Sequence, residues 1–69
     1  MTRATLGNHL KGLRTEAGLT QAELAEKVGV SRKTINTVEN GVFVPSTVLA
    51  LKISAALSEP VERLFWLAR

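Results

Sequence analysis

Residues 31 to 40, SRKTINTVEN, concentrate side chains that form hydrogen bonds and ion pairs. Two cations, an amide and a hydroxyl stand within six residues, on Arg32, Lys33, Asn36 and Thr37. Between them, Ile35 and Val38 have the i, i+3 spacing that places apolar side chains on one buried face of a helix. The polar side chains would then face outward together. This group can bind a polar, anionic surface through several contacts at once.

The sequence does not indicate an enzyme. Ser31, Thr34 and Ser46 carry hydroxyls, but no histidine stands in a recognisable arrangement to activate them. His9 is the only histidine and there is no cysteine, whereas zinc sites need several such ligands. We therefore expect no catalytic residue, no metal and no cofactor, and we interpret His9 as a surface or boundary residue.

Length and charge narrow the class of protein further. With 69 residues, the chain predicts one domain, 1–69, with a modest core. Nine Lys and Arg against six Asp and Glu give a formal net charge of +3, which favours an anionic partner. No apolar run approaches the roughly 18 residues of a membrane span, and the N-terminus lacks the apolar stretch of a signal peptide. We expect a soluble cytoplasmic protein without a membrane partner.

Helical spacing of apolar residues throughout the chain predicts an all-α fold, a compact five-helix bundle. Thr20 and Glu23 form a capping-box pattern, Ser31 and Ser46 are suitable caps, and Gly29 can end a helix with a positive φ. Helices are predicted at about residues 5–17, 20–28, 31–39, 46–57 and 60–67.

The second and third predicted helices are short and joined by a tight turn that contains Gly29. Ala25 is small where two helices in this arrangement approach each other, so a large side chain there would push them apart. Two such helices form a helix-turn-helix unit, whose second helix can enter the major groove of DNA. The polar face of residues 32–37 therefore has the position needed to meet base edges and phosphates.

The stretch LRTEAGLTQAELAEKVGVSRKTINTVENG resembles the XRE-like family of phage-repressor-type transcriptional regulators. The similarity continues through FVPSTVLALKISAAL and EPVERLF, so it covers about residues 6 to 65. It implies a lambda-repressor-like DNA-binding domain of five helices that acts as a homodimer on a palindromic operator. We expect a sequence-specific regulator of transcription that binds double-stranded DNA through the major groove. A repressor is favoured because the chain has no room for a separate effector domain.

The resemblance also implies roles for particular residues. It assigns base contacts to Arg32, Lys33, Asn36 and Thr37. Arg32 and Lys33 can pair with guanine, Asn36 can pair with adenine, and Thr37 can meet a thymine methyl group or a phosphate. It assigns DNA phosphate contacts to Gln21, Ser31, Thr34 and Asn40. Finally, it implies an ion pair between Arg14 and Glu39 that links the first helix to the end of the third.

Two apolar segments are less easily assigned. Many relatives carry a basic or polar residue just after Gly41, where this chain has Val42 and Phe43, and we expect Phe43 to pack beneath the loop. Near the C-terminus, the four bulky residues 64–67 exceed what one helix face can bury. We assign Phe65 to the core, and Trp66 and Leu67 to a dimer interface, with capping of the monomer core as the alternative.

Two other classes of function remain open at the sequence level. An antitoxin or adaptor with the same fold could hold a protein partner through the apolar tail or the Val42–Phe43 loop. A purely structural helical domain would have no nucleic-acid role, and changing Arg32 and Lys33 to acidic residues would then have no effect. Loss of DNA binding in that double variant distinguishes the regulator from the structural domain.

Overall fold

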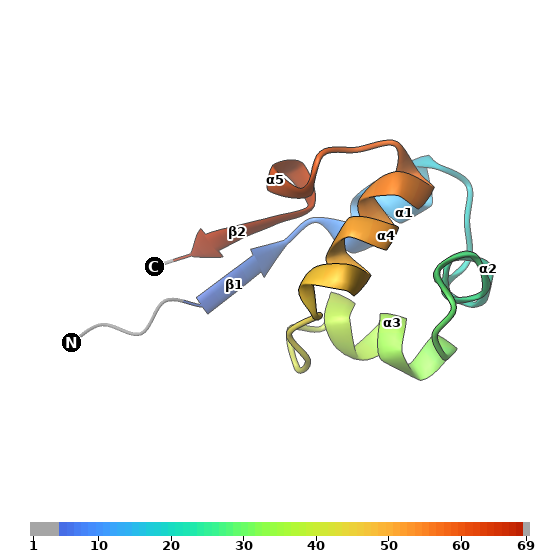
Figure 1. Cartoon of the computed structure of the whole chain (residues 1–69), viewed down its shortest axis with the longest axis horizontal. Helices are drawn as coiled ribbons and strands as arrows, with labels where there is room; N and C mark the ends of the chain where they lie inside the picture. The colour runs from blue at the N-terminus through green and yellow to red at the C-terminus, as the bar shows by residue number, and fades with distance from the viewer. Residues whose placement is uncertain (1–4, 69) are drawn as a thin grey trace.

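Five helices and two short strands follow one another in the computed structural model, which describes residues 5–68 (Figure 1). The elements are β1 (Thr5–Asn8), α1 (Leu10–Glu16), α2 (Gln21–Val28), α3 (Arg32–Glu39), α4 (Thr47–Leu57), α5 (Val61–Leu64) and β2 (Phe65–Ala68). The predicted domain also includes residues 1–4 and 69, which lie outside the described residues. The mostly helical fold and its five helices are confirmed.

Local capping interactions set the ends of the central helices. At the start of α2, the Thr20 hydroxyl accepts from the Glu23 amide at 3.0 Å, and the Glu23 carboxylate accepts from the Thr20 amide at 2.8 Å. Gly29 ends α2 with a φ of +76°, a conformation that costs glycine little. Ser31 and Ser46 cap α3 and α4 through their hydroxyls.

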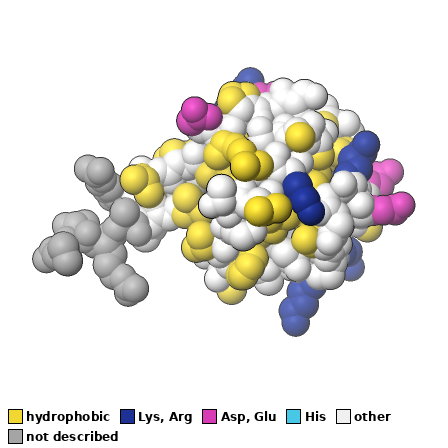
Figure 2. Space-filling model, in the orientation of Figure 1, with side chains coloured by type: hydrophobic (Ala, Val, Ile, Leu, Met, Phe, Trp, Pro, Cys, Tyr) yellow, Lys and Arg dark blue, Asp and Glu magenta, His cyan; other side chains and the backbone are white. Residues whose placement is uncertain are grey.

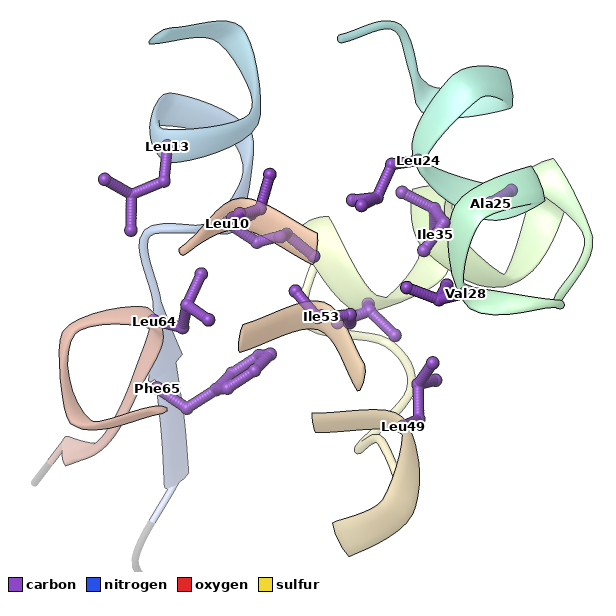
Figure 3. Packing of buried hydrophobic residues seen from close by; sticks show 12 residues of the cluster. Leu10, Leu13, Leu24, Ala25, Val28, Ile35, Leu49, Ile53, Leu64 and Phe65 are labelled. Carbon is purple, nitrogen blue, oxygen red and sulfur yellow. The ribbon is translucent and has the colours of Figure 1, made fainter. Parts of the chain in front are cut away.

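Every helix contributes a fully buried side chain to one core. Leu10, Leu24, Ile35, Ile53 and Leu64, one from each helix in chain order, are all 0% exposed. Figure 3 shows these side chains pointing toward one another between the helices. Burying an aliphatic side chain of this size contributes about 1.5–3 kcal/mol. The core therefore fixes α3 against the bundle through Ile35, and the outer face of that helix stays available.

The helices predicted at 5–17 and 60–67 are shorter in the structure, because residues 5–8 and 65–68 form strands. Thr5–Asn8 and Phe65–Ala68 are strands that pair antiparallel, with Leu6 opposite Leu67 and Gly7 opposite Trp66. The Trp66 ring lies directly over Gly7, where an added Cβ would stand 2.6 Å from Cε2 of the indole. Strands of four residues are too short to show alternation in the sequence. We call this pair of strands the terminal ribbon.

The capping box makes the stability of α2 sensitive to pH. Hydrogen bonds from the Thr20 amide and hydroxyl, with the nearby Lys27, lower the pKa of the Glu23 carboxyl. Because the folded pKa lies below the unfolded one, this contribution is present above the unfolded pKa and is lost as pH falls through the folded value. Glu23→Gln should therefore show a smaller loss of unfolding free energy on acidification than the parent, measured by urea unfolding at pH 7 and pH 3. Equal losses in both proteins would contradict this linkage.

Candidate nucleic-acid interface

The geometry of α2 and α3 presents one face of α3 to solvent. The turn between them is held by a hydrogen bond from the Val30 amide to the Ala25 carbonyl at 3.0 Å, and Ala25 is buried where the helices meet. Ile35 and Val38 anchor α3 in the core, with exposures of 0% and 1%. The opposite face of α3 is therefore held rigidly and left uncovered.

Three of the four predicted base-contacting residues lie together on that uncovered face. Arg32, Lys33 and Asn36 are exposed and line one shallow depression. Among residues 5–68, neither the Arg32 guanidinium nor the Lys33 ammonium group takes part in an ion pair. Such donors can pair with guanine O6 and N7 in the major groove.

Asn36 and Thr37 are already partly engaged within the protein. The Asn36 side-chain oxygen accepts from the side-chain amide of Asn40 at 3.1 Å, which leaves its second lone pair and its NH2 group to pair with adenine. Thr37 is half-buried, and its hydroxyl donates to the Thr34 carbonyl at 2.9 Å. Its methyl group and its hydroxyl lone pairs are the parts left to meet a base.

The residues predicted to hold phosphates occupy both ends of α3 and the start of α2. At the N-terminal end of α3, the Ser31 and Thr34 hydroxyls share a hydrogen bond of 3.0 Å, with Ser31 exposed. Asn40 is exposed at the other end. Gln21 is half-buried and its amide donates to Glu39 at 3.0 Å, a contact that the sequence analysis did not include. The Gln21 side chain therefore supports α3 internally.

A buried ionic network connects the first three helices beneath the exposed face. Arg14 Nε lies 2.6 Å from Glu39 Oε2, with side-chain exposures of 11% and 3%. The second guanidinium nitrogen, Nη2, lies 3.3 Å from Glu39 Oε1, and Nη1 donates to the Leu19 carbonyl at 2.8 Å. Gln21 adds a third side-chain donor group to the same carboxylate region. The expected Arg14–Glu39 pair is thus present, and it fixes the C-terminal end of α3.

Asn8 is a second support of α3 that the sequence analysis missed. Its amide nitrogen donates to the Val38 carbonyl at 3.2 Å, and its side-chain oxygen accepts from the Leu10 amide at 3.2 Å. The terminal ribbon is therefore bonded directly to the last turn of α3. The only signal in the sequence was a capping-type residue shortly before the first apolar position of α1.

The loop after α3 differs from the expectation for Phe43. The Thr37 carbonyl accepts from the amides of both Val42 and Phe43, at 2.9 and 3.2 Å. These bonds hold the loop close to the end of α3 and leave Phe43 47% exposed, so its ring is not packed beneath the loop. Phe65 is buried as expected, whereas Trp66 and Leu67 are 46% and 65% exposed.

A capped helix, a glycine turn and a core-anchored second helix with outward cations define a helix-turn-helix unit. The family described as Helix-turn-helix, HTH_3, matches residues 10–64. The chain therefore belongs to the XRE-type helix-turn-helix family of transcriptional regulators. Proteins of this family bind double-stranded DNA and are not enzymes.

Individual relatives agree with this assignment. The chain is 48% identical over 60 residues to YgzD, a helix-turn-helix-type transcriptional regulator of Bacillus subtilis, covering 87% of this chain and 91% of the relative. It is similar to the crystal structure of the restriction-modification controller protein C.AhdI of Aeromonas hydrophila, with a TM-score of 0.76, 39% identity, and coverage of 81% and 85% of the two chains. The comparisons favour a regulator over the antitoxin or adaptor alternative.

A second solved structure is that of ClgR, the clp gene regulator of Corynebacterium glutamicum. The TM-score is 0.73 at 33% identity, and the match covers 75% of this chain but 55% of ClgR.

Among residues 5–68, no group of three or more His, Cys, Asp and Glu side chains could hold a metal ion. No helix in this described part is long and apolar enough to cross a membrane.

Proposed function

We propose that this protein is a sequence-specific repressor that binds a palindromic operator as a homodimer, in the cytoplasm where the DNA lies. The observation that carries the proposal is the exposure of Arg32, Lys33 and Asn36 on a helix whose other face is fully buried. Repression needs no further surface, because a protein bound in the major groove excludes polymerase from the DNA that it covers. ClgR and C.AhdI, by their names a gene regulator and a controller protein, support a regulatory role.

In this proposal, each polar residue has a separate task. Arg32, Lys33, Asn36 and Thr37 read base edges. Phosphate contacts come from Ser31, Thr34 and Asn40 along α3 and its two ends, and from Gln21 at the start of α2. Arg14 and Glu39 hold the helix that carries these contacts. Asn40→Ala should weaken binding to all DNA sequences, since phosphate contacts carry no sequence information. It also removes the Asn40 donor to the Asn36 oxygen, so any change in preference should be confined to the base pair that Asn36 reads.

A homodimer is proposed because one copy of α3 is short. A helix of eight residues is about 12 Å long, and DNA rises about 3.4 Å per base pair, so one copy reaches roughly three or four base pairs. Two copies double the recognised sequence. Trp66 and Leu67, exposed on the terminal ribbon, are the proposed contact residues.

Selection of bound sequences from a random pool of DNA duplexes tests this function directly. At a stated, low salt concentration, the selected pool should contain an inverted repeat with half-sites about 10 base pairs apart, the spacing of one helical turn. Lys11→Glu, on the exposed face of α1, serves as a control that changes charge away from α3. A pool without any enriched sequence, from a protein that is folded, would contradict sequence-specific binding.

A further inference from the structure

Asn40 and Gly41, at the C-terminal end of α3, form the only Asn-Gly pair in the chain. In such a pair the backbone can attack the asparagine side chain, because glycine has no Cβ to obstruct the ring that forms. Both residues are exposed. A Cβ added at Gly41 would meet no atom within 4 Å, so the space beside the pair is open to water. α3 therefore ends in two residues suited to spontaneous chemical modification.

The reaction needs only these two residues and water. The backbone nitrogen of Gly41 loses its proton and attacks Cγ of Asn40. The new N–Cγ bond closes a succinimide ring, and the Cγ–Nδ2 bond breaks to release ammonia. Water then opens the ring, either at the new N–Cγ bond to leave aspartate or at the other carbonyl to leave isoaspartate. Each product carries a carboxylate where the amide stood, and no oxidant, reductant or other reagent takes part.

The other two asparagines of the chain do not meet these conditions. Asn36 is followed by Thr37, and both residues lie inside α3. Asn8 is followed by His9, and its side-chain nitrogen and oxygen each form a hydrogen bond of 3.2 Å. The side chain of the following residue obstructs ring closure in both cases. Modification is therefore expected first at Asn40.

Hydrogen bonds of the folded protein slow the reaction at Asn40. The Gly41 amide, which must attack, donates to the Val38 carbonyl at 3.1 Å, and the Asn40 side-chain amide donates to Asn36 at 3.1 Å. Glu39, one residue earlier, is the residue of α3 held by the buried ion pair. Opening of the chain after Glu39 breaks these two bonds and leaves the core side of α3 in place. Such local opening at the end of a helix costs much less than global unfolding.

A carboxylate at position 40 would change both the charge and the hydrogen bonds at this end of α3. The donor to Asn36 would be lost, and a negative charge would stand where the proposed function places a phosphate. Residues 40–58 contain no Asp or Glu, and Figure 2 shows acidic side chains at the upper and right edges of this face, away from the loop after α3. The C-terminal end of a helix also disfavours negative charge. Deamidation would therefore weaken the DNA contact and the helix end that makes it.

We propose that Asn40–Gly41 is a site of spontaneous deamidation, and that its conversion to aspartate or isoaspartate ends DNA binding. Bound DNA slows the conversion, because a phosphate held by the Asn40 amide keeps the end of α3 closed. Protein that is not on its operator therefore loses its activity with age. The effect on DNA binding rests on the proposed function, in which Asn40 contacts a phosphate. The chemistry itself does not depend on it.

Ageing of the full chain at pH 8, with and without operator DNA, tests the site. Because the chain contains no aspartate, a protease that cleaves before aspartate should cut between residues 39 and 40 in aged protein alone. Labelling by an isoaspartate methyltransferase detects the other product. The rate should rise with pH, since the attacking nitrogen must lose its proton, and should fall when operator is bound. Asn40→Gln is the matched control: it keeps an amide but would have to close a larger ring, so it should gain neither signal.

Titration of the operator with the same samples tests the consequence for DNA binding. Asn40→Asp reproduces one product and should bind about tenfold more weakly than the parent, because a hydrogen bond is replaced by repulsion from phosphate. The aged parent should approach this affinity as conversion proceeds, whereas Asn40→Gln should keep its own starting affinity. If Asn40→Asp does not fold, the converted parent, separated from the unconverted one by ion exchange, still gives the measurement.

Several results would overturn the proposal. The site is wrong if Asn40 stays unmodified under conditions that convert the urea-unfolded chain, or if Asn8 or Asn36 is modified first. The link to DNA is wrong if fully converted protein keeps the affinity of the parent. Equal rates with and without operator would contradict protection by a phosphate contact. A parent that selects no operator from the random pool would contradict the proposed function, and the protease and labelling assays would still decide the chemistry.

Discussion

Arg14→Ala is expected to lower the free energy of unfolding by about 3–5 kcal/mol, because it leaves a buried carboxylate without its cation. Glu39 is 3% exposed and lies 2.6 Å from the guanidinium, so its charge is balanced by Arg14 and hardly by solvent. The substitution also removes the donor to the Leu19 carbonyl. A chain of this length is stable by about 3–10 kcal/mol in total, so the substitution removes a large part of the stability and lowers the melting temperature.

Urea unfolding followed by circular dichroism at pH 7 measures this loss. Arg63→Ala is the matched control: it breaks the Arg63–Glu59 pair of 3.1 Å, whose side chains are 57% and 25% exposed, and it should cost about 1 kcal/mol or less. Arg14→Leu combined with Glu39→Leu should be more stable than Arg14→Ala, since no charge is then stranded. Equal losses of unfolding free energy for Arg14→Ala and Arg63→Ala would show that the Arg14–Glu39 pair stabilises the protein no more than the exposed Arg63–Glu59 pair.

The consequence for function is that Arg14→Ala would imitate the loss of a DNA contact. Glu39 ends α3, and Arg14 with Gln21 holds that end against α1 and α2. DNA binding should therefore fail in parallel with folding, and it should recover at a temperature or osmolyte concentration where the variant is folded. An affinity that stays low in the folded variant would indicate a direct phosphate contact by Arg14.

Local signals in the sequence predicted the interior of the fold well. The Thr20–Glu23 capping box, the Ser31 and Ser46 caps and Gly29 each act within three or four residues, so their physical effect is readable from the sequence. The burial of Ile35 and Val38 follows from their spacing in the same way. Because Ile35 and Val38 face the core, Arg32 and Lys33 lie on the opposite, outward face of the same helix.

Contacts between distant residues could not be predicted in this way. Leu6 and Leu67 pair across 61 positions of sequence, and the strands that carry them are four residues long. The bonds from Gln21 to Glu39 and from Asn8 to Val38 also depend on how separate elements meet. The exposure of Phe43 depends on the two amides bound by the Thr37 carbonyl, which no local pattern indicates.

Arg32→Glu combined with Lys33→Glu is expected to abolish specific DNA binding. Each residue should lose a base contact of about 1–3 kcal/mol, so the pair should lower affinity by roughly 30-fold to 10⁴-fold. Repulsion between the new carboxylates and DNA phosphates adds to this loss at low salt. Titration of the selected operator with each protein, at two salt concentrations, measures the effect.

The control for total charge is Lys11→Glu combined with Lys52→Glu, at two exposed lysines outside α3. Each reversal subtracts two charges, so both double variants change the formal net charge from +3 to −1. The control should lose only the long-range attraction, which falls as salt is raised. Equal losses of affinity in the two double variants would mean that α3 has no specific role in binding.

The double variant Arg32→Glu, Lys33→Glu should become more stable while it loses DNA binding. A loss of DNA contacts can therefore be told apart from unfolding. Arg32 and Lys33 are the first two residues of α3 after its Ser31 cap, where the positive end of the helix dipole disfavours cations. Acidic residues at these exposed positions should stabilise the helix by about 0.3–1 kcal/mol each. The parent sequence thus carries two cations where the helix itself would favour anions, and an anionic partner accounts for that choice. If the variant is folded and more stable but no longer binds its operator, the loss arises at the contact between α3 and DNA and not from unfolding.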